Sequence, residues 1–101
     1  MKIQIEAPFQ VHADLEELVQ EKVGKLGTYF ERILSATVFF KEEEHRHSNE
    51  VPAGKTAEIR LDVPGQTLYA DSSADSFEKA LAETTQKVGR QLRKYKQQLS
   101  R

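Results

Sequence analysis

The feature that most constrains the fold is a long stripe of apolar residues near the C-terminus. Seven positions with spacings of 4, 3, 4, 4, 3 and 4 residues fall on one narrow side of a helix, which the sequence predicts to be about 24 residues long. These positions are Phe77, Leu81, Thr84, Val88, Leu92, Tyr95 and Leu99. Asp75 is the expected N-cap, and Glu78 completes a capping box. A helix with one apolar side must pack against another element.

Four shorter segments alternate apolar and polar residues, which is the pattern of half-buried β-strands. They cover residues 2–7, 35–41, 55–63 and 66–71. Pro64 and Gly65 form a tight turn between the last two, which therefore make a hairpin.

A second, shorter helix is predicted over residues 15–26, with Asp14 as its N-cap and Gly27 as its stop. Residues 28–34 fit a further helical turn and a connector, and supply Tyr29, Phe30 and Ile33 to the core. The order of elements is therefore strand, helix, three strands, helix. This order predicts an α+β fold: a four-stranded, largely antiparallel sheet with both helices packed on one face.

Composition narrows the class of protein further. At 101 residues we expect one domain, which spans residues 1–101. There is no cysteine, so disulfides and thiolate metal sites are excluded. No apolar run is long enough for a transmembrane helix, and the N-terminus reads as a strand and not as a signal peptide. We therefore expect a cytoplasmic protein without a membrane partner.

Basic residues gather at one end of the chain. Residues 86–101 carry six basic side chains and no acidic one, whereas residues 1–74 carry 8 basic and 13 acidic ones, a net of −5. The net charge of the whole chain is only −1. Charge separated in this way favours a phosphate-rich partner that is contacted through one surface.

On the C-terminal helix, basic residues cover most of the side opposite the apolar stripe. The candidate RNA-binding residues are Lys87, Arg90, Arg93, Lys94 and Lys96, together with Lys22 and Lys25 on the first helix. A solvated face that complements the helix dipole, or an acidic protein partner, explains the same pattern. If the two helices lie side by side, their cations merge into a patch that suits an RNA backbone.

Other chemistry has little support in the sequence. No nucleophile has an identifiable base and no glycine-rich phosphate loop is present, so we expect neither an enzyme nor a small-molecule substrate or cofactor. His45 and His47 follow three glutamates, but a third ligand is not specified, so a polar loop over residues 42–54 is preferred to a metal site. Phe39 and Tyr69 fit either an aromatic patch or a cross-strand pair on the outer sheet face.

Two stretches resemble a known family. Residues 21–26 read Glu-Lys-Val-Gly-Lys-Leu, and residues 87–96 read Lys-Val-Gly-Arg-Gln-Leu-Arg-Lys-Tyr-Lys. With the order of elements, they are similar to the ribosome hibernation promoting factors, a group that includes the ribosome-associated translation inhibitor and the sigma-54 modulation proteins. The likeness spans nearly the whole chain.

The resemblance implies a fold like the double-stranded RNA-binding domain. It also implies binding to the small ribosomal subunit and its rRNA, in the cleft where messenger and transfer RNA sit. Binding there inhibits translation and favours stored, inactive ribosomes, as in a stress or stationary-phase response. The residues that match the family's basic positions are Lys22, Lys25, Lys87, Arg90 and Lys94, and Arg93 and Lys96 extend the same surface.

Three features depart from the family pattern. The sequence stops at Arg101, without the dimerisation domain of the long form, so it resembles a short form; whether it pairs ribosomes, alone or with a second hibernation factor, stays open. The segment Glu42 to Gly54 is longer and more acidic than expected. Leu81 and Ala82 stand where the family often has isoleucine and an acidic residue.

Two alternatives also stay open. The first is a protein-interaction module whose basic helix docks on an acidic protein. The second is a general binder of duplex RNA, which the net negative charge of the rest of the chain disfavours.

Overall fold

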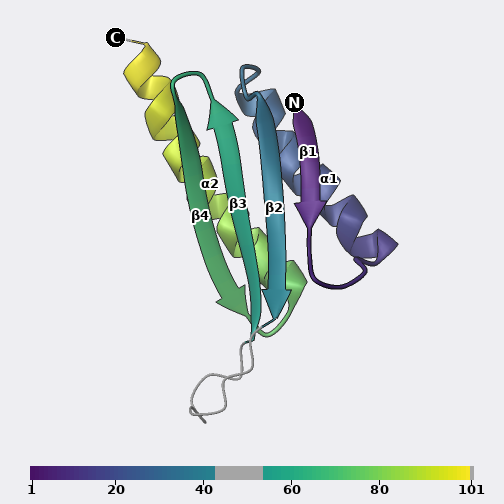
Figure 1. Ribbon diagram of the computed structural model, residues 1–101. Coiled ribbons are helices and arrows are strands. Elements are labelled where there is room, and N and C mark those ends of the chain that lie inside the picture. Colours follow the sequence, from purple (N-terminus) through teal and green to yellow (C-terminus); the bar gives the residue numbers. More distant parts are fainter. Residues whose placement is uncertain (43–53, 101) are drawn as a thin grey trace.

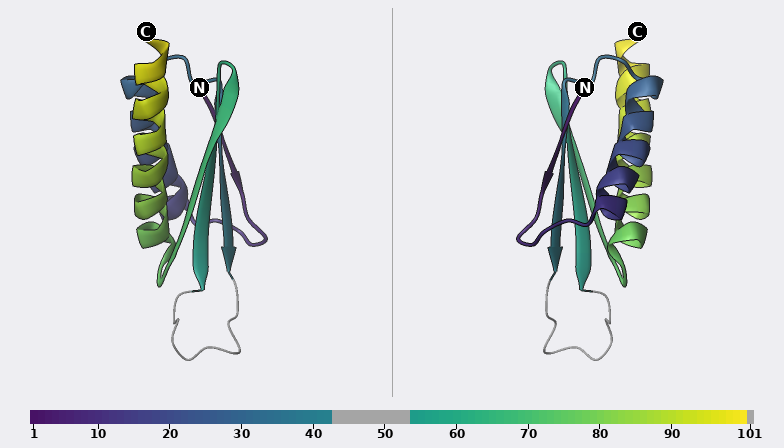
Figure 2. Two further views of the ribbon diagram at one scale, coloured as in Figure 1. Left: turned by 90° about the vertical axis from the view of Figure 1, so that its left-hand side faces the viewer. Right: turned by 90° about the vertical axis from the view of Figure 1, so that its right-hand side faces the viewer.

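The sheet and the helices form two layers. A computed structural model describes residues 1–42 and 54–100 of the chain. The elements in chain order are β1 (Lys2–Glu6), α1 (Ala13–Tyr29), β2 (Ser35–Glu42), β3 (Lys55–Val63), β4 (Gln66–Ala74) and α2 (Phe77–Leu99). Figure 2 shows both helices on the same face of the sheet, which leaves the other face uncovered. The predicted α+β fold is confirmed.

The strands are ordered β1-β2-β3-β4 in the sheet, as they are in the chain. β1 pairs with β2 in parallel, and the other two pairs are antiparallel. The parallel pair needs a crossover, which α1 provides. Both helices run in the same direction and end beside each other at the end of the molecule that holds both termini (Figure 1).

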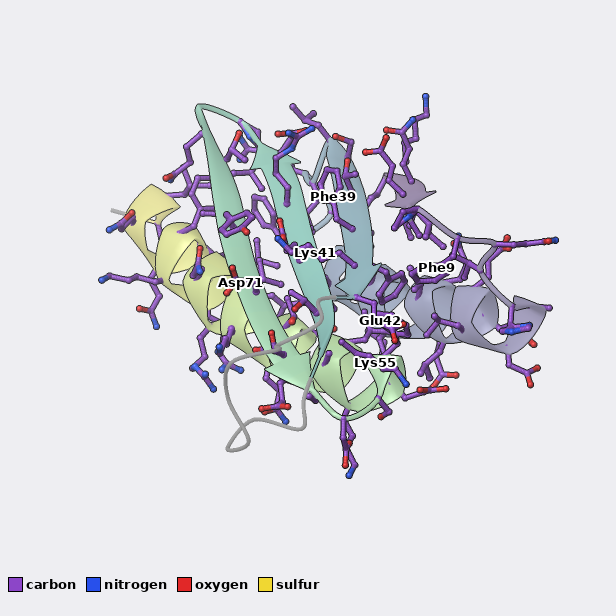
Figure 3. The ribbon with its side chains drawn as sticks, turned by 60° about the horizontal axis from the view of Figure 1, so that its bottom comes forward. Phe9, Phe39, Lys41, Glu42, Lys55 and Asp71 are labelled. Carbon is purple, nitrogen blue, oxygen red and sulfur yellow. The ribbon has the colours of Figure 1, made fainter. Side chains whose placement is uncertain are left out.

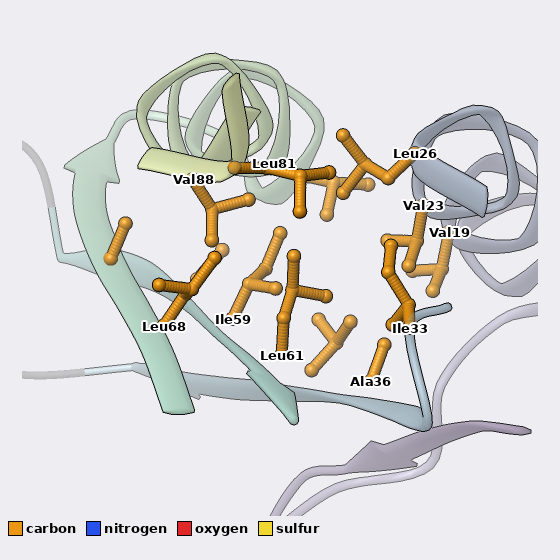
Figure 4. Close-up of a cluster of buried hydrophobic side chains, with 14 of the residues drawn as sticks. Val19, Val23, Leu26, Ile33, Ala36, Ile59, Leu61, Leu68, Leu81 and Val88 are labelled. Carbon is orange, nitrogen blue, oxygen red and sulfur yellow. The ribbon is translucent and has the colours of Figure 1, made fainter. Parts of the chain in front are cut away.

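The core fills the space between the sheet and the helices (Figure 4). The apolar residues of the predicted stripe are buried from Leu81 to Tyr95, whereas Leu99 in the last turn is 44% exposed. α1 contributes its own stripe, whose buried residues are Leu15, Val19, Val23 and Leu26. The strands alternate as predicted, with Ile59 and Leu61 of β3 fully buried at the centre.

Two predicted ends of α1 are wrong. The helix begins at Ala13, and its N-cap is His12, whose side chain makes no capping hydrogen bond, so Asp14 lies within the first turn. Gly27 does not stop the helix, which continues to Tyr29. The extension is favoured because it brings Phe30 into the core, and Phe30 is 7% exposed while Tyr29 stays 42% exposed.

The N-cap of α2 is Ser76 and not Asp75. The Ser76 hydroxyl accepts a hydrogen bond from the backbone N–H of Lys79, and the Asp75 carboxylate instead pairs with the Lys79 ammonium at 3.1 Å. Residues 72–74, which the sequence placed outside the strand, extend β4 to Ala74. The strand is longer because these residues pair with residues 55–57 of β3.

The uncovered face of the sheet carries a polar network. Lys41 pairs with Glu58 at 2.6 Å, and the Tyr69 hydroxyl donates to Glu58 at 2.9 Å. Lys41, Phe39 and Asp71 are labelled on the sheet in Figure 3. Phe39 and Tyr69 are not a cross-strand pair, because they lie on β2 and β4 with β3 between them.

Candidate nucleic-acid interface

The two helices lie side by side and enclose a shallow groove. The hollow holds about 580 Å³ and is lined from α1 by Lys22, Lys25 and Leu26 and from α2 by Ala82, Thr85, Gln86, Gly89, Arg90 and Arg93. The two helices run in the same direction, and the groove lies between residues 22–26 of α1 and residues 82–93 of α2 (Figure 1). This arrangement fulfils the condition under which the cations of the two helices join into one patch.

Four of the seven predicted RNA-binding residues meet at this groove. Lys22 and Lys25 form one rim, and Arg90 and Arg93 form the other. The spacing explains the arrangement, because residues three apart on a helix share one side. On α2 these two arginines lie on the flank toward α1, next to the buried stripe through Val88.

The floor of the groove consists of small side chains. Ala82, Thr85 and Gly89 line it from α2, and Gly89 lacks a side chain where the helices approach. A Cβ atom at Gly89 would lie 3.7 Å from Cδ2 of Leu26 on α1, which is an ordinary contact distance. The floor of the groove therefore lies between Lys22 and Lys25 on one side and Arg90 and Arg93 on the other.

Little negative charge neutralises the rims. Lys25 lies 3.9 Å from Glu21 one turn earlier in α1, and both side chains are largely exposed, so this pair is weak. Within residues 1–42 and 54–100, no carboxylate forms an ion pair with Lys22, Arg90 or Arg93. Within these residues, the cations on both rims are therefore available to an anionic partner.

Lys87 lies on the other flank of α2, beside the edge of β4. Its ammonium donates to the main-chain oxygen of Asp71 at 2.8 Å. With Arg90, Gln91 and Tyr69 it lines a second hollow between α2 and β4. Lys87 therefore does not join Lys22 and Lys25, and only Arg90 borders both hollows.

Lys96 is held at the C-terminal end of α1. Its ammonium donates to the main-chain oxygen of Tyr29 at 3.1 Å and lies 4.5 Å from the centre of the Tyr29 ring. α1 has no basic residue in its own last turn, so Lys96 supplies the cation that this helix end favours. Its position is explained by the fold.

Lys94 is exposed on α2 and lines neither hollow. It lies four residues after Arg90, on the same side of the helix, and so extends the basic surface toward the C-terminal end. The structure thus gathers four predicted residues at one groove and leaves Lys87, Lys94 and Lys96 around it. Whether any of the seven contacts RNA stays a prediction.

Hydrogen bonds from α2 to β3, β4 and the turn between them hold the helix in place, and the sequence did not predict them. Gln91 donates to the Tyr69 main-chain oxygen at 2.6 Å and accepts from the Tyr69 N–H at 3.2 Å. The buried Thr84 hydroxyl lies 2.8 Å from the main-chain oxygen of Ala57, and the Tyr95 hydroxyl donates to that of Pro64 at 2.6 Å. Thr84 and Tyr95 belong to the predicted stripe, but spacing gives no sign of the hydrogen bonds that their hydroxyls and Gln91 make.

Neither a metal site nor a membrane span is found in the described residues. No group of three potential metal-ligating side chains occurs in residues 1–42 and 54–100. His45 and His47, and most of the predicted polar loop, lie outside the described residues. In the same ranges, neither helix combines the length and the apolar content that spanning a bilayer requires.

The fold and the groove define an α+β protein with a cationic surface on its paired helices. The chain belongs to the family described as Sigma 54 modulation protein / S30EA ribosomal protein, whose profile it matches over residues 3–100. The family resemblance inferred from the sequence is thereby confirmed. The family is defined by a ribosomal protein and not by a reaction, in agreement with the expectation that the chain is not an enzyme.

Individual relatives support the assignment. The ribosome hibernation promotion factor of Staphylococcus aureus strain COL is 26% identical over 100 residues, a match that covers 92% of this chain and 50% of that protein. The chain thus spans about half the length of this curated relative.

Two solved structures share the fold, each with a TM-score of 0.78. A ribosomal subunit interface protein from Coxiella burnetii is 24% identical, and the match covers 95% of this chain and 98% of that one. The N-terminal domain of Thermus thermophilus Protein Y is 18% identical, with 94% and 99% covered. At these identities the two structures establish the fold alone.

Proposed function

We propose that this chain is a ribosome hibernation factor that binds the small ribosomal subunit through its rRNA. The folded domain, residues 1–101, would occupy the cleft for messenger and transfer RNA, and would inhibit translation by that occupancy in the cytoplasm. The observation that carries the proposal is the groove between α1 and α2, whose rims present Lys22, Lys25, Arg90 and Arg93. The family and the name of its Staphylococcus aureus relative support a ribosomal partner.

The physical basis of binding is neutralisation of phosphates. Each lysine or arginine that contacts a phosphate releases condensed counterions, so affinity falls as salt rises. Four contacts predict a slope of about −3 to −4 in a plot of log K against log salt concentration. Contacts of this kind fix position and orientation but do not read base sequence, so the shape of the rRNA must supply specificity.

The remaining basic residues have lesser roles. Lys94 extends the surface past Arg90, where it meets phosphates beyond the groove. Lys87 and Lys96 hold main-chain oxygens of the fold with their ammonium groups. They add to the positive potential that attracts RNA, and they keep the helix that carries the arginines in place.

The test is co-sedimentation with purified small subunits in sucrose gradients. A double variant, Arg90→Glu with Arg93→Glu, reverses one rim of the groove and should abolish co-sedimentation. The matched control is Lys2→Glu with Lys79→Glu, which changes the net charge by the same amount at exposed positions away from the groove. The control should sediment with subunits as the unchanged protein does.

Three outcomes decide the proposal. Loss of binding in the groove variant alone, with unchanged circular dichroism, supports it. Equal binding by both variants refutes the groove as the RNA interface. Binding that survives complete nuclease digestion of the rRNA would instead favour a module that docks on an acidic protein. Inhibition of cell-free translation by the same set of variants then checks the mechanism.

A further inference from the structure

The two edges of the sheet differ in whether side chains cover their backbone groups. At the β4 edge, Gln91 bonds both backbone groups of Tyr69, and Lys87 bonds the main-chain oxygen of Asp71. These contacts close the edge against another strand. At the opposite edge, β1 pairs only with β2 within the described residues. Open sheet edges bind extended peptides in many complexes.

The backbone of β1 presents usable groups on this open side. The Lys2 N–H donates to the Leu34 oxygen next to β2, which sets the direction of the ladder. Along a strand, the backbone N–H and C=O groups of alternate residues point to opposite neighbouring strands, so those of Gln4 also point toward β2. Ile3 and Ile5 therefore direct their N–H and C=O groups away from the sheet, where an added strand would pair with both.

A groove lined by five apolar and three polar residues runs beside the same edge. It holds about 510 Å³ and is lined by Ile3, Ile5, Ala7, Phe9, Gln10 and Val11 on one side and by Glu16 and Gln20 of α1 on the other. The five apolar residues are only partly buried and pack against the core. Side chains of an added strand that face the helices would enter this groove.

The charge around this edge is negative. Residues 1–21, which include all of β1, carry five carboxylates and one lysine, Lys2, and the carboxylate of Glu16 lines the groove. An occupant with basic side chains therefore fits this edge. We propose that the β1 edge binds an extended peptide segment of a partner protein, with apolar residues at alternate positions and basic residues between them.

A second copy of this chain fits less well. Pairing two β1 strands antiparallel keeps the helices of both copies on the same face of the joined sheet. The N-terminal half of α1 extends beyond β1 in Figure 1, so the two α1 helices would compete for the same space. A bare peptide strand carries no such helix and passes beside α1.

The peptide site is separate from the RNA groove. Glu16 and Gln20 lie on one flank of the buried stripe of α1, and Lys22 and Lys25 lie on the other. Both sites can be filled at once, and the variant Arg90→Glu with Arg93→Glu should bind peptide normally. Failure of the peptide proposal would leave the ribosome proposal unaffected, and the reverse also holds.

The experiment uses a capped, fluorescent octapeptide that alternates valine and lysine, with binding followed by anisotropy. Two isomers carry N-methyl groups on either the valines or the lysines, so their composition and charge are identical. In antiparallel pairing the valines share the side of Ile3 and turn their N–H groups toward β1. We therefore expect the valine-methylated isomer to bind at least about tenfold more weakly than the unmethylated peptide. The lysine-methylated isomer should bind as the unmethylated peptide does.

Amide hydrogen exchange of the protein supplies a second readout. The N–H groups of Ile3 and Ile5 should exchange at least about tenfold more slowly with bound peptide, whereas that of Gln4 is protected throughout. Glu16→Gln should weaken binding about threefold, and the matched change Glu83→Gln on α2 should not alter it.

Defined results would overturn the proposal. Equal binding by all three peptides shows that attraction between charges suffices and no strand is added. Unchanged exchange of Ile3 and Ile5 at saturating peptide would likewise exclude strand addition at this edge. Slowing of these amides with protein concentration, in the absence of peptide, would assign the edge to a second copy of the chain.

Discussion

Alanine substitutions at two helical glycines should distinguish an effect on stability from an effect on binding. Gly24 lies inside α1 and Gly89 inside α2. A Cβ atom at Gly24 would meet no atom within 4 Å, and one at Gly89 would meet only Leu26, at 3.7 Å. Neither position has a positive φ angle. Alanine is therefore sterically accepted at both, and the two substitutions differ in one respect: only Gly89 lines the groove between the helices.

The expected gain in stability follows from helix propensity. Alanine favours a helix interior over glycine by about 0.8–1.0 kcal/mol. Gly24→Ala and Gly89→Ala should each raise the free energy of unfolding by about this amount, since neither creates a clash. For a chain of about 100 residues this corresponds to an increase in melting temperature of about 4–8 °C. Urea unfolding and thermal melts followed by circular dichroism measure both values.

The effect on binding should differ between the two variants. The methyl group of Gly89→Ala occupies the floor of the groove, where a phosphate would approach the backbone of α2. Displacing one charged contact costs about 1.5 kcal/mol, so affinity for small subunits should fall about tenfold. Gly24→Ala should bind as the unchanged chain does, although it is equally stabilised.

Two results would refute this reasoning. If Gly89→Ala binds small subunits with unchanged affinity, the ligand does not reach the groove floor, and binding rests on the rims alone. If Gly89→Ala is destabilised, the helices tolerate less than the 3.7 Å contact indicates. Gly24→Ala controls for helix propensity in both measurements, because it carries the same substitution in the other helix.

Three further substitutions test contacts that support the fold. Tyr95→Phe removes a hydroxyl that donates to a main-chain oxygen in the β3–β4 turn, and should lower the free energy of unfolding by about 1 kcal/mol in urea titrations. The pKa of Glu58 lies below its usual value, chiefly because Lys41 donates a hydrogen bond to it. The ionised Glu58 therefore adds to the free energy of unfolding above the unfolded-state pKa, and this gain is lost as pH falls through the folded-state pKa. Glu58→Gln should make the free energy of unfolding fall less steeply at acid pH. Lys96→Met should lower the free energy of unfolding by about 0.5–1 kcal/mol, because the Lys96 ammonium is held by Tyr29. The same change should leave the salt dependence of RNA binding unchanged. A decrease of one in the slope of log K against log salt concentration would contradict this.

The sequence was a reliable guide where periodicity alone determines structure. The stripe through Val88 predicted the length and the buried side of α2, and strict alternation predicted the inward residues of β3. Helix ends were predicted less well. Asp14 and Asp75 are residue types that often cap helices, but the packing of the fold determines where each helix begins. The N-cap residues are His12 for α1 and Ser76 for α2.

The candidate site could be predicted only in part, because a single helix does not reveal its neighbours. Charge selected Lys22 and Arg93 as surface cations, yet whether they face each other depends on how α1 and α2 pack. The structure brings these two to one groove, and turns Lys87 to the far side of α2. Spacing along α2 separates Lys87 from Arg93 around the helix, but it does not show which flank of the helix faces α1.

α2 combines three functions on three sides, and Lys87 shows why charge alone does not identify a ligand. One side is buried through Val88, a second bonds the backbone of β4 through Lys87 and Gln91, and a third presents Arg90 and Arg93. Lys87 belongs to the second side. Its ammonium closes the β4 edge, which would otherwise offer free backbone groups to another chain. A lysine satisfies this role and also raises the local positive potential, so one residue both holds the helix and favours an anionic partner. The arginines of the third side can therefore be replaced without loss of the fold, whereas replacing Lys87 alters the fold and the binding surface together.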